Sequence, residues 1–496
     1  MKNKTLLKIL CLAAVLCMFF AACAGDTGSK SDAPDGGTAA EAEVTEAVTE
    51  PEYKRPDVDY NGREFIFSAW ATDSPNWVAT SYCEITSEEQ NGDIINDAIY
   101  DRRLAVEESF GITIVPRKYK SGGEMVNSTM AGDHYADTVL LDGGAIPKVV
   151  SGQLCLDLFT IETLDLTKSW WNQTATDQLT IGGKLFFAPG NIGSFDALSV
   201  FTTYVNKNMV ESFNLSNPYD EVRSGTWTVD VMEEHAKTVA ADLNGDGVMD
   251  DKDRFGMSSE ALTSVVLRSC GVTLTEKDSD DYPVYSLVGS AGNTARAASV
   301  IEKIVPLWRD KATTLYTGDF SSKYSHVFSQ FLVPQFIADK LLYLNNWMSV
   351  AFEMRKMDSD FGILPPPKFD ESQESYYVPA SESWTAYAVV PITVTDTDYT
   401  GHIMDALGYY GKEYIHTALI DKTITNKTIR DTDTEEMLEI IYANRTFDIA
   451  ALYDWGGLNG ILSGFISGNS TDFMSKMAAS EEKIVAAIAT TIEELQ

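Results

Sequence analysis

The chain has 496 residues, of which 73 are acidic and 38 basic, and its formal net charge at pH 7 is −35. So acidic a protein is repelled by nucleic acid and by anionic lipid, which excludes both as binding partners. With 44% apolar residues and nine Trp the chain can build large cores, and its length favours two lobes over one.

The first 22 residues are typical of a bacterial lipoprotein signal peptide. Three lysines precede an apolar stretch over residues 9–20, which is too short to span a bilayer of about 30 Å. Two alanines directly before Cys23 resemble a lipobox, in which the cysteine is lipidated and becomes the mature N-terminus. We therefore expect an exported protein held on the extracytoplasmic face of the cell membrane by lipid alone. The alternative is a plain secretory signal with an incidental cysteine.

Residues 23–59 are rich in Gly, Ala, Thr, Ser, Pro and acid, which predicts a flexible tether after the lipidated Cys23. Beyond the tether only Cys83, Cys155 and Cys270 remain. This odd number is no disulfide framework, so three thiols, or one bridge and one thiol, are both open. The five histidines show no spacing typical of a zinc site.

From about residue 60 onward, strand patterns alternate with helix patterns. Buried strands are expected over 65–70, 112–115 and 138–141, and residues 95–106 have an apolar helix face between the first two. Strand–helix–strand order predicts a mostly parallel sheet flanked by helices, with ligands at the carboxyl ends of its strands. Four later strands and two helices are also expected: strands over 200–205, 341–344, 361–364 and 385–390, and helices after Thr228 and at the C-terminus.

The sharpest local motif is a calcium-type loop over residues 242–253. Oxygen ligands stand at loop positions 1, 3, 5, 7, 9 and 12, and a glycine stands at position 6, as in an EF-hand loop. The expected ligands are Asp242, Asn244, Asp246, the carbonyl of Val248, Asp250 and Asp253. An aspartate replaces the usual glutamate at position 12, and no second loop accompanies the first. We expect a structural Ca²⁺ and no organic cofactor; a solvated turn without an ion is the alternative.

Several tryptophans lie near the predicted ends of strands and helices. Indole faces can stack on sugar rings, and nearby Asp, Asn and Ser side chains can bind hydroxyl groups. For any single Trp, however, packing in a core is the more common role. Trp170 and Trp171 are interpreted as structural and Trp227 as packing before a helix cap, whereas Trp347 and Trp384 are better candidates for a binding site.

Taken in order, the pieces of the chain resemble the family 1 extracellular solute-binding proteins of bacterial ABC transporters, in the carbohydrate-binding, maltose-binding-protein-like branch. The resemblance runs from about residue 60 to the end. It rests on the order of these motifs: the lipobox, the acidic tether, the strand–loop–helix opening, the Asp142-Gly-Gly turn, Asn206-Lys207, Trp227-Thr228, the Leu-Asn-Asn-Trp ending at Trp347, and the Phe-Gly-Ile-Leu-Pro-Pro beginning at Phe361.

The resemblance implies an α/β, two-lobe, periplasmic-binding-protein-like clamshell of type II. Each lobe would hold a mixed, mostly parallel sheet flanked by helices, and several chain crossings would form the hinge. The N-lobe would comprise residues 60–190 and 368–412, and the C-lobe residues 193–360 and 415–496. The crossings are expected near 189–194, 361–367 and 412–418.

By position, the resemblance also implies the residues that hold the ligand. Asp142 matches a polar turn after an N-lobe strand, and Trp347 a stacking aromatic after a C-lobe strand. Residues 70–77, from Trp70 to Trp77, match the first ligand loop. Asp196 lies where the chain enters the second lobe. Ser383 and Trp384 precede the strand that returns to the first lobe.

The expected function is that of a lipid-anchored receptor that is not an enzyme. It would work as a monomer that captures a small solute, expected to be an oligosaccharide, and delivers it to the membrane permease of an ABC importer. A peptide or another polar solute stays open. The alternatives are an exported glycoside hydrolase, in which Asp142 and Glu382 could be imagined as acid and base, and a surface adhesin or sensory protein with the same fold. No GxSxG or HExxH motif supports an enzyme.

Overall fold

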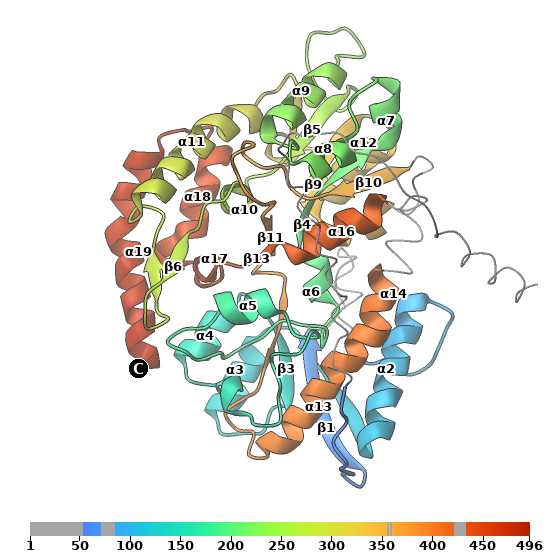
Figure 1. Cartoon of the computed structure of the whole chain (residues 1–496), viewed down its shortest axis with the longest axis vertical. Helices are drawn as coiled ribbons and strands as arrows, with labels where there is room; N and C mark the ends of the chain where they lie inside the picture. Colours follow the sequence, from blue (N-terminus) through green and yellow to red (C-terminus); the bar gives the residue numbers. More distant parts are fainter. Residues whose placement is uncertain (1–52, 71–84, 355–356, 358–359, 421–432) are drawn as a thin grey trace, which may run out of the picture. The chain divides into compact units, whose positions relative to one another are not determined.

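The computed structural model of the protein describes residues 53–70, 85–354, 357, 360–420 and 433–496. Its main strands form two sheets of four and five strands, and helices fill most of the intervening sequence (Figure 1). Two pairs of short strands complete the sheet structure in this part: β6 (Thr275–Lys277) with β7 (Pro283–Tyr285), and β11 (Val378–Pro379) with β13 (Arg445–Thr446).

The first sheet has the strand order β12-β3-β1-β2. Its strands are β1 (Arg63–Trp70), β2 (Ile112–Tyr119), β3 (Thr138–Asp142) and β12 (Ala386–Val389). Strand β1 runs parallel to both of its neighbours, and β12 runs antiparallel to β3. The strands expected in this part of the sequence are therefore confirmed. The last strand comes from a segment that lies more than 240 residues further along the chain, so the first sheet is closed by a return of the chain.

The second sheet has the order β10-β4-β9-β5-β8. Its strands are β4 (Phe201–Asn206), β5 (Phe255–Ser259), β8 (Thr314–Tyr316), β9 (Leu341–Trp347) and β10 (Phe361–Leu364). Strand β5 is parallel to β8 and β9, whereas β4 is antiparallel to β9 and β10. The second sheet is thus mixed, with as many parallel as antiparallel strand pairings. Because β5 and β9 are parallel, their carboxyl ends meet at one edge of the sheet.

Helices follow most strands in the described residues. Those between the strands up to β10 are α2 (Ile94–Phe110), α3 (Gly123–Met130), α4 (Ile146–Ser151), η2 (Leu158–Thr160), α5 (Gln173–Gln178), α6 (Phe195–Leu198), α7 (Lys207–Ser212), α8 (Pro218–Ser224), α9 (Val229–Val239), α10 (Thr263–Ser269), α11 (Ala291–Trp308), η3 (Thr317–Phe320), η4 (Phe328–Leu332), α12 (Val333–Ile337) and η5 (Met348–Phe352). After β12 come α13 (Thr397–Tyr410), η7 (Gly411–His416), α14 (Thr417–Leu419), α16 (Asp433–Ala443), α17 (Ile449–Tyr453), η9 (Trp455–Gly457), α18 (Leu458–Ser467) and α19 (Phe473–Leu495).

Local sequence explains where the main helices begin and end. Asp93 caps α2 by accepting hydrogen bonds from the backbone N–H groups of Ile95 and Asn96, and Gly111 ends the helix at a φ of 60°. Thr228 caps α9: its hydroxyl oxygen accepts a hydrogen bond from the backbone N–H of Val231. The predicted buried face of α2 and the predicted N-cap of α9 are both confirmed.

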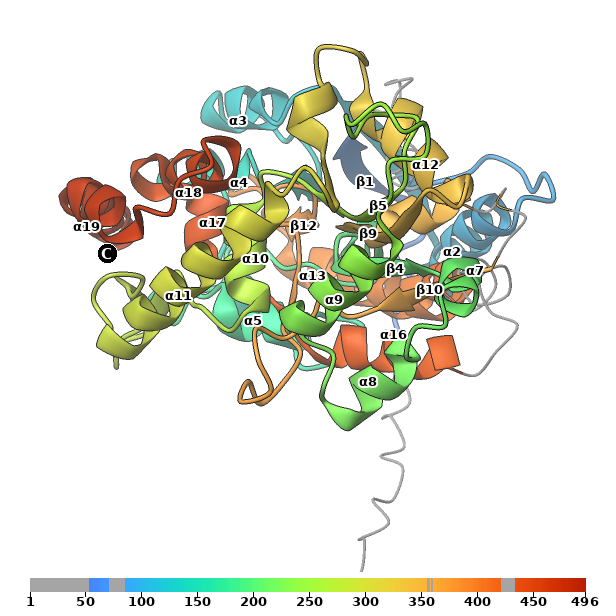
Figure 2. The ribbon, with the colours of Figure 1, turned by 90° about the horizontal axis from the view of Figure 1, so that it is seen from above.

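Apolar side chains form two clusters. One lies against the second sheet, with α2, α12, α14 and α16. The other extends from the first sheet through α17, α18 and α19 to α9, α10 and α11. Helix α19 contacts α4 beside the first sheet as well as α11, and α18 packs against α10 and α11. Helices α18 and α19 lie next to each other in both views (Figures 1 and 2). The C-terminal helices therefore contact elements that belong with both sheets, and the assignment of residues 415–496 to one lobe stays a prediction.

The chain passes between the sheets where the sequence predicts crossings. It leaves the first-sheet region through residues 189–200 and returns from β10 to β12 through residues 365–385. The third expected crossing coincides with the π-helical turn η7, between α13 and α14. The exact lobe boundaries stay predictions. Among the described helices, none combines the length and the apolar character that crossing a bilayer requires.

The tryptophan pair after residue 169 is structural, as interpreted from the sequence. Trp170 and Trp171 are buried, and both indole N–H groups donate to one carboxylate oxygen of Asp405 on α13, at 2.7 and 3.3 Å. Burial raises the pKa of Asp405 to about 6. Tyr53, the first described residue, packs edge-on against Trp170. The start of the described chain is thus fixed against this aromatic cluster. Cys155 and Cys270 are buried free thiols, and Cys83 lies outside the described residues.

The raised pKa of Asp405 predicts a pH-dependent cost to stability. Because the folded state binds this proton more tightly than the unfolded chain, Asp405 lowers the free energy of unfolding as the pH rises from about 4 to 6. Asp405→Asn removes that titration but keeps an oxygen for the indoles. In chemical denaturation, the free energy of unfolding of the variant, relative to that of the native protein, should rise by roughly 1 to 2 kcal/mol between these pH values. The exposed Asp133→Asn should show no such gain; parallel pH profiles for all three proteins would contradict the assignment.

Candidate binding site

A pocket lies where β1 and β3 end and β12 begins. The pocket is shallow and partly open to solvent. Its walls include two indoles that stay 37% and 41% exposed, Trp70 and Trp384. The remaining lining residues are Ala69, Ile85, Arg102, Tyr119, Leu140, Asp142, Ile192, Gly193, Ser194, Phe195, Thr385 and Ala386. Exposed indoles on a mostly apolar wall offer flat faces to a ligand.

Asp142 supplies a carboxylate to this pocket at the end of β3. Its Oδ1 accepts a hydrogen bond of 3.0 Å from the backbone of Gly144, and its Oδ2 has no partner among the described residues. Burial raises the pKa of Asp142, and only backbone N–H groups oppose that rise. The turn that follows is tightly held, because a Cβ on Gly143 would lie 1.8 Å from the backbone oxygen of Glu382. Glycine is therefore required there for the return segment to pass beside Asp142.

The pocket also has two polar groups that are almost completely buried. Arg102 on α2 donates to the backbone oxygens of Ile192 and Ile85, at 2.8 and 2.7 Å, and its Nε has no partner. Burial lowers the pKa of Arg102 to about 10, which leaves it charged at neutral pH. The hydroxyl of Ser194 also has no hydrogen-bond partner in the described part. Both unpartnered atoms are closed off from solvent, so these two residues shape the pocket wall without offering those atoms to a ligand in this arrangement.

A second set of polar and aromatic side chains stands at the carboxyl ends of β5 and β9. Asn346 is held by two contacts: its Oδ1 accepts from the backbone N–H of Trp347 at 2.8 Å, and its Nδ2 donates to Oε1 of Glu260 at 3.0 Å. Glu260 follows β5 directly and is half-buried. Burial raises its pKa to about 7, and the Asn346 amide opposes that rise. Trp347 and Glu260 thus project from adjacent parallel strands, the usual place for a ligand in α/β folds.

Two crossing segments bring these sets of residues together. The hydroxyls of Ser199 and Thr385 form a hydrogen bond of 2.8 Å. The backbone N–H of Ser381 donates to the backbone oxygen of Ser199, also at 2.8 Å. Phe201 follows two residues, about 7 Å, after Ser199 and packs its ring edge-on against Trp347 at 5.2 Å. Thr385 lines the pocket beside Trp384. The crossing therefore places Trp347 near the pocket that contains Trp384 and Asp142.

Other residues proposed from the sequence have different surroundings. Ser383 is exposed, and its backbone oxygen accepts from Gly143 at 3.3 Å. Asp196 is buried in a polar network, with one oxygen 2.9 Å from the Asn172 amide and the other 2.7 Å from Arg445. Both oxygens of Asp196 are thus occupied by the protein itself. Trp77 lies outside the described residues. The ligand roles of all the proposed residues stay predictions.

A buried ion pair fixes the segment that carries Trp384. Arg268 on α10 and Glu382 are each about 5% exposed and pair through both nitrogens and both oxygens. Glu382 also accepts from the backbone N–H of Asp448, which caps α17. Burial raises the pKa of Glu382, and Arg268 opposes that rise. Glu382 does not line the pocket, so it is not placed to act there as an acid or base with Asp142.

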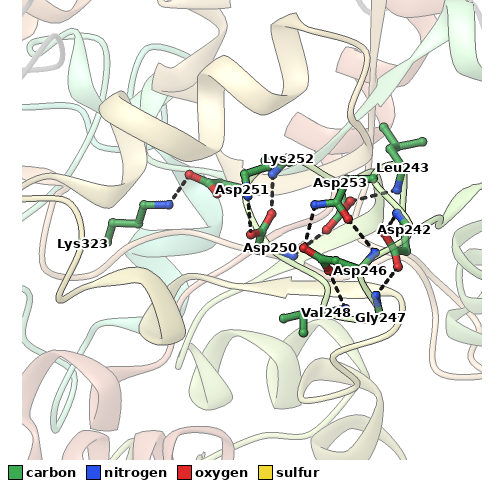
Figure 3. A network of polar contacts seen from close by, with 12 residues as sticks. Asp242, Leu243, Asp246, Gly247, Val248, Asp250, Asp251, Lys252, Asp253 and Lys323 are labelled. Atoms are coloured by element: carbon green, nitrogen blue, oxygen red, sulfur yellow. Dashed lines mark hydrogen bonds and ion pairs between the residues drawn. The ribbon is translucent and has the colours of Figure 1, made fainter.

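The predicted calcium loop forms a compact turn before β5 (Figure 3). Asp242 accepts from the backbone of Gly245 and Gly247, at 2.7 Å each, and Asp246 accepts from Val248 at 2.9 Å. The fully buried Asp253 accepts from Leu243 and Asp250. These backbone hydrogen bonds lower the pKa of Asp242.

The donor set of the loop suits a hard cation, but its carboxylates do not converge in this arrangement. In the described part of the chain, no group of three or more His, Cys, Asp or Glu side chains is placed to hold a metal ion. Each carboxylate oxygen that accepts one N–H keeps a second lone pair. The chemistry of the donors therefore fits Ca²⁺, while the observed positions of the side chains are those of a turn held by backbone amides. The calcium site stays a prediction.

Glu260, Arg102 and Ser194 join the candidate site without having been proposed as ligand residues, whereas Trp70 begins the predicted first ligand loop. A signal existed for Glu260, since it directly follows the run Phe-Gly-Met-Ser-Ser, which forms β5. A strand of this length without β-branched residues gives little periodic pattern. Arg102 was expected only as a residue on the buried face of a helix.

No protein-family model and no curated protein matches this sequence. Solved structures do share its architecture. A sugar transporter from Rhizobium etli in an open conformation matches with a TM-score of 0.55 and 14% identity over 87% of this chain and 100% of its own. The fold is that of the two-lobe substrate-binding proteins.

Two further structures with this fold were solved with a bound sugar. An ABC substrate-binding protein from Listeria monocytogenes in complex with cycloalternan matches with a TM-score of 0.54 and 12% identity, over 86% of this chain and 99% of its own. A cyclo/maltodextrin-binding protein complexed with maltotetraose matches with a TM-score of 0.52 and 14% identity, over 88% and 99%. Identities this low establish the fold alone. The expected periplasmic-binding-protein-like fold is thereby confirmed.

Proposed function

We propose that this protein is the solute-binding receptor of an ABC importer, that it binds an oligosaccharide and that it does not transform it. The observation that carries the proposal is the pocket with two exposed indoles and a carboxylate, which a third indole adjoins through the crossing. Indole faces stack on the apolar faces of sugar rings, and carboxylates accept hydrogen bonds from hydroxyl groups. Structures with this fold include proteins that bind cycloalternan and maltotetraose.

In the proposed mechanism, ligand binding shifts an equilibrium between arrangements of the two lobes. A saccharide that contacts Trp384 and Asp142 on one side and Trp347 on the other favours the arrangement in which both contacts exist. The closed receptor then delivers the saccharide to the membrane subunits of the importer. No organic cofactor takes part, and the receptor works as a monomer.

Binding and chemistry can be separated in one titration. Tryptophan fluorescence should change on addition of the bound oligosaccharide, and the recovered sugar should be unchanged by chromatography. Trp347→Ala and Trp384→Ala should each weaken binding more than tenfold. We expect a sugar ring stacked on an indole to contribute about 1–3 kcal/mol, as a nucleobase stacked on an aromatic side chain does. Phe159→Ala, which truncates an exposed aromatic side chain that does not line the pocket, serves as the control. Turnover of the sugar would support the hydrolase instead.

We also propose that Cys23 carries lipid and holds the receptor at the outer face of the cell membrane. The sequence of the first 23 residues supports this assignment. Two or more acyl chains suffice for stable anchoring. Cys23→Ser should move the protein from the membrane fraction to the medium in cell fractionation, without changing its affinity for the sugar. A native protein already free in the medium would rule out the anchor.

We further propose that the loop of residues 242–253 binds a structural Ca²⁺. Its support is the EF-hand-like spacing and the free lone pairs on its carboxylates. A cation would relieve repulsion among the acids of this loop and stabilise the segment that leads into β5. EDTA should therefore lower the melting temperature, and added Ca²⁺ should restore it. Asp246→Asn should abolish the EDTA effect; an unchanged melting temperature of the native protein with EDTA would show an ion-free turn.

A further inference from the structure

Glu260 is a carboxylate at the candidate site without a cationic partner. Its Oε1 accepts from the Asn346 amide, and its Oε2 has no hydrogen-bond partner among the described residues. Glu260 is half-buried, so part of the residue is exposed to solvent. In the part of the chain that the structure describes, no lysine, arginine or histidine forms an ion pair with Glu260. Burial alone raises its pKa, and no charged side chain contributes.

Asp142, at the end of β3 in the first sheet, is also a carboxylate without a cationic partner among the described residues. One oxygen accepts from the Gly144 backbone, the residue lines the pocket, and no charged side chain shifts its pKa. Both carboxylates thus lack the positive charge that half-buried acids normally have beside them.

The nearby arginines do not supply that charge. Arg102 directs its Nη atoms to two backbone oxygens. Arg268 is paired with Glu382, and Arg445 with Asp196. Each guanidinium is therefore committed within the protein, and none of these arginines supplies a counter-charge for Glu260.

The aromatic residues at the site are suited to the same kind of ligand. An indole face attracts a cation through its quadrupole as well as the C–H face of a sugar, and a pocket of indoles with a carboxylate is a common arrangement for ammonium groups. The large negative charge of the protein also draws cations toward its surface. Aromatic faces and unpaired acids together favour a solute that is both a saccharide and a cation.

We propose that the solute is a basic saccharide, whose protonated amine pairs with Glu260 while its rings lie against Trp347 and Trp384. Asn346 holds Glu260 in position for this contact. The inference rests on the proposed function, since it specifies the saccharide that the same site would bind.

Matched pairs of oligosaccharides test this proposal on the full-length protein. Each pair has the same linkage and length and differs in whether the sugar units carry a hydroxyl or a free amine at C2, as in cellotetraose and its glucosamine counterpart. Tryptophan fluorescence at neutral pH should show that the amino member of a binding pair binds about tenfold more tightly or better. Equal binding of both members would overturn the basic-saccharide inference and leave the saccharide receptor standing. If no member of any pair bound, the receptor proposal would fall as well.

Glu260→Gln separates the charge from the hydrogen bond. Glutamine still accepts a hydroxyl proton but cannot pair with an ammonium group, so the amino saccharide should lose about tenfold in affinity while the neutral one changes little. The exposed Glu302→Gln on α11 removes the same charge elsewhere and should affect neither member. An equal loss for both members in Glu260→Gln would show that Glu260 binds hydroxyls, which contradicts the proposal. A melting curve confirms that each variant is folded.

Discussion

The candidate site depends on two chain segments that cross between the sheets side by side. Val200 and Ala380 form an antiparallel bridge, the Ser199 backbone accepts from Ser381, and the Ser199 and Thr385 hydroxyls join directly. These contacts link residues 180 or more positions apart in sequence, so the pocket depends on the tertiary fold. Because one segment leads into β4 and the other into β12, the same few hydrogen bonds set the positions of Trp384 and of the strand that pairs with Trp347.

A buried ion pair holds the segment of this crossing that carries Trp384. Arg268 and Glu382 are both withdrawn from water, which costs several kcal/mol for each ion and is repaid only when the geometry is well matched. Their pairing through two nitrogens and two oxygens meets that condition. Since Glu382 also accepts from the N-cap residue Asp448, one carboxylate joins α10, the crossing and α17. The ion pair therefore specifies one position for the Trp384 segment, in addition to any gain in stability.

The sequence predicts the framework of this protein better than its polar network. The burial period of α2, the Thr228 cap and the strands that end at Asp142 and Trp347 depend on neighbours in sequence, and all are present. Asp196 shows the limit: its place near the first crossing is predictable, but its partner Arg445 lies 249 residues away, and only the fold brings them together. The sequence did not predict β5, and so did not point to Glu260, because β5 contains Gly256. A Cβ at Gly256 would lie 2.3 Å from the backbone of Ala236 in α9. Close packing against α9 thus removed the apolar pattern that identifies a strand.

The acids of the loop before β5 differ physically from those at the ends of β3 and β5, and the contrast bears on what the site binds. In the loop before β5, carboxylates accept backbone N–H groups that lower the pKa of Asp242, so these charges are stabilised within the protein. At the ends of β3 and β5, burial raises the pKa of Asp142 and Glu260, and each keeps an oxygen without a partner. A fold that satisfies one set of acids with its own backbone can do so elsewhere. Leaving the second set unsatisfied beside three indoles is consistent with a ligand that completes their hydrogen bonds and charge.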